Sequence, residues 1–175
     1  MTATAPAKPN IFDRDARISP CERYRYTLTR RWGHSSGPGV TWLLLNPSTA
    51  DGKHDDQTVR RIVDFSHQWG HDSLVVVNLF GLRATQPAAL ALAEDPVGPD
   101  NDQVLLGACI AADLVIAAWG CQPRALNRAR EVLALLDKRS TTGRPFPMSC
   151  LGRTAKGKPR HPSRRSRSAS LEVFR

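Results

Sequence analysis

The sequence lacks any apolar run long enough to cross a bilayer. Its longest apolar runs, within residues 72–80 and 112–120 of the 175-residue chain, have about the length of a β-strand. A transmembrane helix needs roughly 20 apolar residues. The first ten residues also lack the apolar core of a secretory signal. We therefore predict a cytoplasmic protein without a transmembrane span.

Closely spaced cysteines are missing as well. No two of the four cysteines are separated by only two residues, and no pair of histidines lies near them; they are Cys21, Cys109, Cys121 and Cys150. This spacing excludes a zinc finger and a cysteine-bound iron–sulfur cluster. We expect four reduced, structural thiols, as is typical of a reducing compartment.

Acidic residues are scarce near the C-terminus. Between residues 152 and 175, eight basic residues stand against one acid, so this segment carries +7 of the formal net charge of +9. Such a run can neutralise nucleic-acid phosphates, although a solvated, disordered end explains it equally well. We expect a flexible arm at 1–20, a single α/β domain at 21–163 and a basic, disordered tail at 164–175.

Five segments are predicted to be β-strands. Residues 23–32 alternate large and polar side chains, as in a half-buried strand. The segments 40–45, 74–80 and 114–120 are mainly continuous apolar runs, which favours parallel strands that are covered on both faces. A further strand is expected within residues 145–152.

Helical segments are predicted between these strands. Residues 56–69 have an apolar face at helical spacing, with Asp55 or Asp56 as the expected N-cap. Further helices are expected at 87–93, where Pro87 opens the helix, at 99–112 and at 124–138. This alternation predicts a three-layer α/β/α sandwich around a mainly parallel central sheet.

Polar side chains follow the predicted strands, where parallel sheets bind ligands. The set comprises Asn46, Pro47, Ser48, Asn78, Trp119, Gly120, Arg160, His161 and Ser163. Each has a structural alternative, because an Asn-Pro pair often begins a turn and a buried Asn78 needs hydrogen-bond partners in any case. His161, in a basic loop, is also compatible with a surface phosphate contact or a solvated side chain.

Three aspartates crowd behind Asn46, and these are Asp51, Asp55 and Asp56. An asparagine accepts protons poorly, so a neighbouring carboxylate is a candidate general base, and the group is also a candidate metal site. Helix capping is the alternative for Asp55 or Asp56, but both cannot be the cap. Arg60, on the following helix, is a candidate for substrate binding.

Seven segments together resemble the family named domain of unknown function 1643, across residues 21–163. They are RYRYTLTRRWG, TWLLLNPSTAD, HDDQTVRRI, WGHDSLVVVNLFGLRATQPAAL, DPVGPDND, LVIAAWG and GKPRHP. The order of the strand-end motifs is also similar to that of the uracil-DNA glycosylase superfamily. There, an Asn-Pro or Asp-Pro loop, an Asn, a Trp-Gly pair and a His-Pro-Ser loop follow four successive strands.

The second resemblance implies the cleavage of a base from its sugar. Asn46 would position the attacking water, Asn78 would read the Watson–Crick edge of the base, and His161 would stabilise negative charge on the departing base. Two features depart from the pattern. Pro47 is not followed by the Gly or Tyr-His of known glycosylases, and the loop after His161 lacks the apolar wedge that fills the gap left by a flipped base.

We therefore predict a nucleobase-acting enzyme that hydrolyses or otherwise processes a base in nucleic acid or in a nucleotide. The alternative is a non-catalytic module on the same fold that binds nucleic acid or a modified nucleotide. We expect no cofactor, while a metal at the three aspartates stays open, and no membrane partner. The sequence leaves the substrate base and the oligomeric state open.

Overall fold

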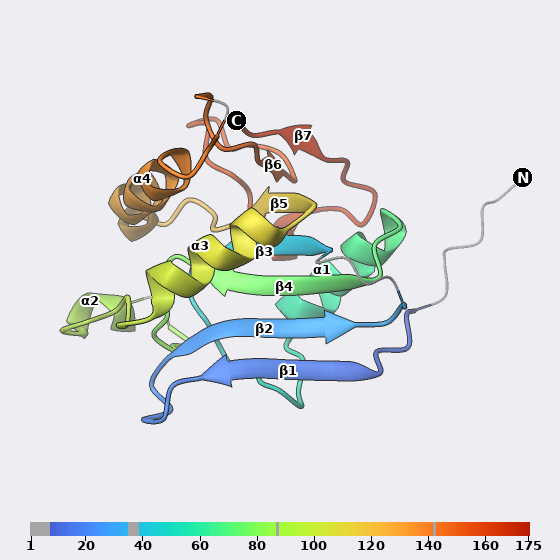
Figure 1. The fold of residues 1–175 in the computed structure, drawn as a ribbon, viewed down its shortest axis with the longest axis horizontal. Helices are drawn as coiled ribbons and strands as arrows, with labels where there is room; N and C mark the ends of the chain where they lie inside the picture. The colour runs from blue at the N-terminus through green and yellow to red at the C-terminus, as the bar shows by residue number, and fades with distance from the viewer. Residues whose placement is uncertain (1–7, 35–38, 87, 142) are drawn as a thin grey trace, which may run out of the picture.

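The computed structural model describes residues 8–34, 39–86, 88–141 and 143–175, and within them seven strands form one sheet (Figure 1). The strands are β1 (Asp13–Ile18), β2 (Arg25–Arg31), β3 (Val40–Leu44), β4 (Ser73–Asn78), β5 (Leu114–Ala117), β6 (Ser149–Cys150) and β7 (Glu172–Val173). Their order across the sheet is β1-β2-β4-β3-β5-β6-β7.

The sheet is mixed, whereas the sequence predicts a mainly parallel one. Strands β4, β3, β5 and β6 are parallel to one another, while β1, β2 and β7 each pair antiparallel with a neighbour. The parallel strands are joined through helices, which provide the long crossovers that parallel pairing requires. Strands β1 and β2 are joined by a short turn, which favours antiparallel pairing.

Helices cover the two faces of the sheet. Helix α1 (Gln57–Gln68) packs on one face, whereas α3 (Asn101–Ala111) and α4 (Pro123–Asp137) pack on the other (Figure 1). A short helix, α2 (Ala89–Leu92), follows β4; Pro87, expected to open it, lies outside the described residues. In the part of the chain that the structure describes, no helix is both long and apolar enough to span a membrane.

The continuous apolar run of β3 contributes to two separate cores. Trp42 and Leu44 pack in the cluster that contains α1, and Leu43 and Leu45 pack in the cluster that contains α3 and α4. Successive side chains of a strand point to opposite faces. A strand covered on both faces therefore needs apolar residues at every position, as the sequence predicts for this segment.

Both ends of the chain add strands to the sheet edges. Residues 13–18, expected in a flexible arm, form β1, while residues 1–7 lie outside the described part of the chain. Residues 172–173, expected in a disordered tail, form β7, which pairs with β6. Strand β1 is polar and exposed at most positions, and β7 is an exposed Glu-Val pair, so neither carries an apolar pattern that reveals an edge strand.

Candidate functional site

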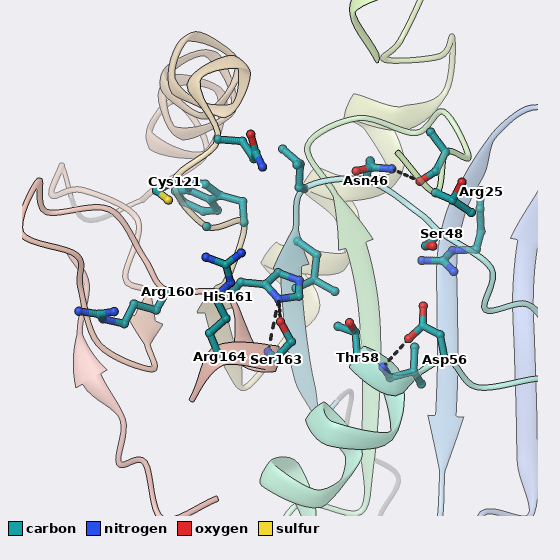
Figure 2. A pocket seen from close by; sticks show the side chains of 18 of the residues that line it. Arg25, Asn46, Ser48, Asp56, Thr58, Cys121, Arg160, His161, Ser163 and Arg164 are labelled. Carbon is teal, nitrogen blue, oxygen red and sulfur yellow. Dashed lines mark hydrogen bonds between the residues drawn. The ribbon is translucent and has the colours of Figure 1, made fainter. Parts of the chain in front are cut away.

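A cavity of about 320 Å³ lies where the parallel strands end (Figure 2). Of the predicted site residues, the segments after β3 and β5 contribute Asn46, Ser48, Trp119 and Gly120 to its wall. The start of α1 and the loop after β6 contribute Asp56, Arg160, His161 and Ser163. Three of the four predicted strand-end motifs therefore meet at one cavity.

Asn46 offers the cavity a hydrogen-bond acceptor. Its side-chain nitrogen donates to the backbone oxygens of Pro47, at 2.9 Å, and Ala84, at 2.8 Å. Both amide hydrogens are therefore engaged, and these two hydrogen bonds fix the orientation of the side-chain amide. The side-chain oxygen is then left as the acceptor of a residue that lines the cavity (Figure 2). Pro47 itself is buried and does not line the wall.

His161 offers the cavity a donor. The backbone N–H of Ser163 donates to Nδ1 of His161 at 3.3 Å, and the Ser163 hydroxyl lies 2.8 Å from the same atom. A backbone N–H can only donate, so Nδ1 accepts and the neutral ring carries its proton on Nε2. Burial and the nearby charge of Arg164 lower the pKa of His161, against an opposing effect of Asp56. The geometry thus favours a neutral imidazole with an Nε2–H donor.

The three aspartates separate in the structure. Asp56 is the N-cap of α1, since its Oδ1 accepts from the backbone N–H of Val59 at 2.8 Å, and it also lines the cavity. Asp55 lies outside the cavity wall and pairs with Arg30 at 2.7 Å and with Arg14 at 2.6 Å. The alternative left open by the sequence is decided in favour of Asp56 as the cap.

Asp51 closes a turn and does not line the cavity. Its Oδ1 accepts from the backbone N–H groups of Lys53 and His54, both at 2.7 Å, and these bonds lower the pKa of Asp51 to about 2. Within the described residues, no group of three or more histidine, cysteine, aspartate or glutamate side chains is arranged to hold a metal ion. The carboxylates expected to act together therefore do not form a cluster.

Arg25 is a charged cavity residue that the strand-end motifs do not include. It lies at the start of β2 and is only 3% exposed, yet it lines the wall. Its Nη1 donates to the backbone oxygen of Ala50 at 2.7 Å, and its Nη2 approaches Oδ1 of Asn78 at 3.4 Å. Burial lowers the pKa of Arg25 to about 10. The only signal in the sequence is a cation between Tyr24 and Tyr26, both of which are buried.

Asn78 and Arg60 do not line this cavity. Asn78 is buried behind Arg25, and within the described residues its side-chain nitrogen has no hydrogen-bond partner. Arg60 lies on α1 at a separate hollow of about 340 Å³. The wall also includes Thr58 and Arg164, which no strand-end motif contains.

The comparisons with known proteins identify a family but no characterised relative. No curated protein and no solved structure matches the chain, so the resemblance to the uracil-DNA glycosylase superfamily stays a prediction. A family model described as "Protein of unknown function (DUF1643)" matches residues 25–163. This match covers β2 through the His161 loop, and the chain therefore belongs to the DUF1643 family.

Proposed function

We propose that the protein binds a nucleobase in this cavity and hydrolyses the bond between that base and its sugar. The observation that supports the proposal most is that the fixed oxygen of Asn46 and the Nε2–H of His161 line the same cavity. They come from different strand ends, as the resemblance to the uracil-DNA glycosylase superfamily implies. A volume of about 320 Å³ is within the range of small-molecule sites.

The proposed reaction assigns one role to each of three side chains. As the bond from C1′ to the base nitrogen breaks, its electron pair leaves with the base, and His161 donates a hydrogen bond to an oxygen of that base. Asn46 accepts a hydrogen bond from the water that attacks C1′. Asp56 takes the proton that this water releases, and the departed base is protonated by solvent.

The arrangement of the helices and the sheet supports this proposal. Helix α1 on one face and helices α3 and α4 on the other support the three-layer α/β/α sandwich that we propose as the finer fold class. In an open parallel sheet, ligands bind beyond the carboxyl ends of the strands. The cavity lies at that edge.

A non-catalytic base-binding module is the second candidate. One oxygen of Asp56 is engaged in capping α1, and Asp51 and Asp55 are bound away from the cavity. Recognition of a base needs donors and acceptors but no general base, so this arrangement favours a module that binds without reaction.

Base release distinguishes the two candidates. The protein is incubated with uracil-, hypoxanthine- and mismatch-containing strands, single and double, and with free nucleosides and nucleotides, and free base is measured by mass spectrometry. The enzyme proposal expects free base from at least one substrate. Binding of these ligands without release of base would support the non-catalytic module. The absence of both binding and release would contradict both candidates.

A further inference from the structure

We propose that the ligand of this cavity carries a terminal phosphate, as a mononucleotide does, and that Arg25 binds that phosphate. The identity of the remainder of the ligand rests on the proposed function, whereas the phosphate site rests on the charges of the cavity itself.

Arg25 differs from the other buried arginines in having no acidic partner. Arg30 is fully buried and pairs with Asp55 at 2.7 Å. Arg128, 7% exposed, pairs with Glu131 at 3.2 Å and also with Asp102. Within the described residues Arg25 forms no ion pair, and its Nε has no hydrogen-bond partner at all. A buried guanidinium without a direct ion pair is costly, because the lost hydration is only partly replaced.

The neighbours of Arg25 leave the cavity positive. Arg164 and Arg160 also line the wall, against the single carboxylate of Asp56. The guanidinium of Arg160 bonds to the backbone oxygen of Arg153 and points away from the cavity centre (Figure 2). Asp56 offsets part of the charge of Arg25, but Arg25 and Arg164 together leave a net positive charge, which a neutral base would not compensate and an oxyanion would neutralise.

The position of Arg25 selects a terminal phosphate. In Figure 2, Arg25 lies beside Ser48 and Asp56 on one side of the cavity, and His161 lies opposite with Ser163 and Arg164. A phosphodiester within a strand must leave the cavity in two directions, which a guanidinium that is 3% exposed does not allow. A phosphate monoester ends at Arg25, so a single nucleotide would extend from there toward His161.

The test is the melting temperature of the wild-type protein at constant ionic strength, with inorganic phosphate or chloride. A ligand that binds only the folded state raises this temperature in a saturable way. We expect phosphate to do so, and nucleoside monophosphates to bind at least tenfold more tightly than the matching nucleosides. A 5′-phosphorylated oligonucleotide distinguishes two sources of the phosphate. An affinity equal to that of the nucleoside monophosphate indicates a strand end, and a weaker affinity indicates a free nucleotide.

Two substitutions test Arg25 directly. Arg25→Gln removes the charge, and Asn78→Asp places a carboxylate within 3.4 Å of Nη2 at nearly unchanged volume. Asn78→Asp should melt at or above the wild-type temperature, because it supplies the missing partner, and both variants should lose the response to phosphate. Arg130→Gln, an exposed position on α4 outside the cavity, is the matched control and should keep the response.

The outcomes separate this inference from the proposed function. A wild-type protein that does not respond to phosphate, or an Asn78→Asp variant with a full response, overturns the phosphate site, whether or not Arg25→Gln folds. Release of base from nucleosides as fast as from nucleotides would also overturn it, while it would support the proposed function. A response to phosphate without any preference for nucleotides over ribose 5-phosphate would contradict the base pocket and support the phosphate site.

Discussion

At the scale of single residues, the site depends on which atom of each polar group is left for a ligand. His161 directs Nε2 to the cavity because the backbone N–H of Ser163 occupies Nδ1. Asn46 presents its oxygen because both amide hydrogens are bonded to backbone oxygens. Both groups are therefore held in one orientation before a ligand arrives, which is the condition for effective charge stabilisation.

His161→Ala should reduce base release by about a hundredfold or more, comparable to the loss of one charge-stabilising donor. The loop should keep its backbone bonds, so circular dichroism should show an intact fold. His54→Ala is the matched control, since His54 is 80% exposed and lies outside the cavity. An equal loss of activity in both variants would contradict a specific role for His161.

The lowered pKa of His161 predicts a pH-dependent stability. The unfolded chain takes up a proton on this histidine as the pH falls through about 6.5, its ordinary value. The folded protein resists that proton, so the free energy of unfolding falls as the pH decreases below about 6.5. The melting temperature of the wild type should decrease from pH 7 to pH 5, and His161→Gln should flatten the decrease. If the melting temperature of His161→Gln depends on pH as strongly as that of the wild type, another group causes the pH dependence.

At the scale of secondary structure, Asp56 combines a cap with a place in the cavity wall. Asp56→Asn should keep the N-cap bond to Val59, because asparagine caps helices about as well as aspartate. Asp56→Ala should cost about 1 kcal/mol of stability through loss of the cap. If Asp56 is the base, both variants should lose base release. Chemical denaturation should show a loss of stability only for Asp56→Ala. Full activity in Asp56→Asn would remove Asp56 from the mechanism.

Most elements could be predicted from the sequence because the strands at the sheet centre are covered on two faces. The run 40–45 and the helical face of 57–68 follow directly from that coverage. Strand β1 could not be found in this way, because its residues are polar and mainly exposed. Strand β1 pairs with β2, which covers an edge of β1 rather than one of its faces.

The strand-end rule found Asn46, Trp119 and His161 but missed Arg25 for a geometric reason. The rule collects residues at the carboxyl ends of parallel strands. Strand β2 is antiparallel to β4, so its amino end lies at the same edge of the sheet. Arg25 is the first residue of β2. Its position becomes evident only when the direction of that strand is known, and a single sequence does not specify the direction.

At the scale of the whole molecule, the C-terminal segment supports the cavity wall. Phe174 packs edge-on against Trp119, with ring centroids 5.5 Å apart, and Arg153 lies over the Phe174 ring. The backbone of Phe174 bonds to Met148 at 2.8 Å, and Arg175 pairs with Asp137. The segment expected to be a disordered tail therefore fixes a residue of the site.

Deletion of residues 166–175 should lower the melting temperature by about 5 to 10 °C, which corresponds to a loss of about 2.5 kcal/mol at roughly 2 to 4 °C per kcal/mol in a domain of this size. Binding of nucleotides should weaken as well, because Trp119 loses its support. Arg167→Gln is the control for charge alone, because Arg167 is 72% exposed, and it should melt as the wild type does. An unchanged melting temperature after the deletion would support a disordered tail, as the sequence predicts.

The positions of β1 and β7 have a practical consequence for recombinant fragments. The family match begins at Arg25 and ends at Ser163, so it omits both of these strands. A fragment cut at those positions would leave the N–H and C=O groups of β2 open along the whole strand, and those of the two-residue strand β6 open as well. Such a fragment should associate edge to edge and elute in the void volume of a sizing column, while residues 8–175 should elute as a discrete species.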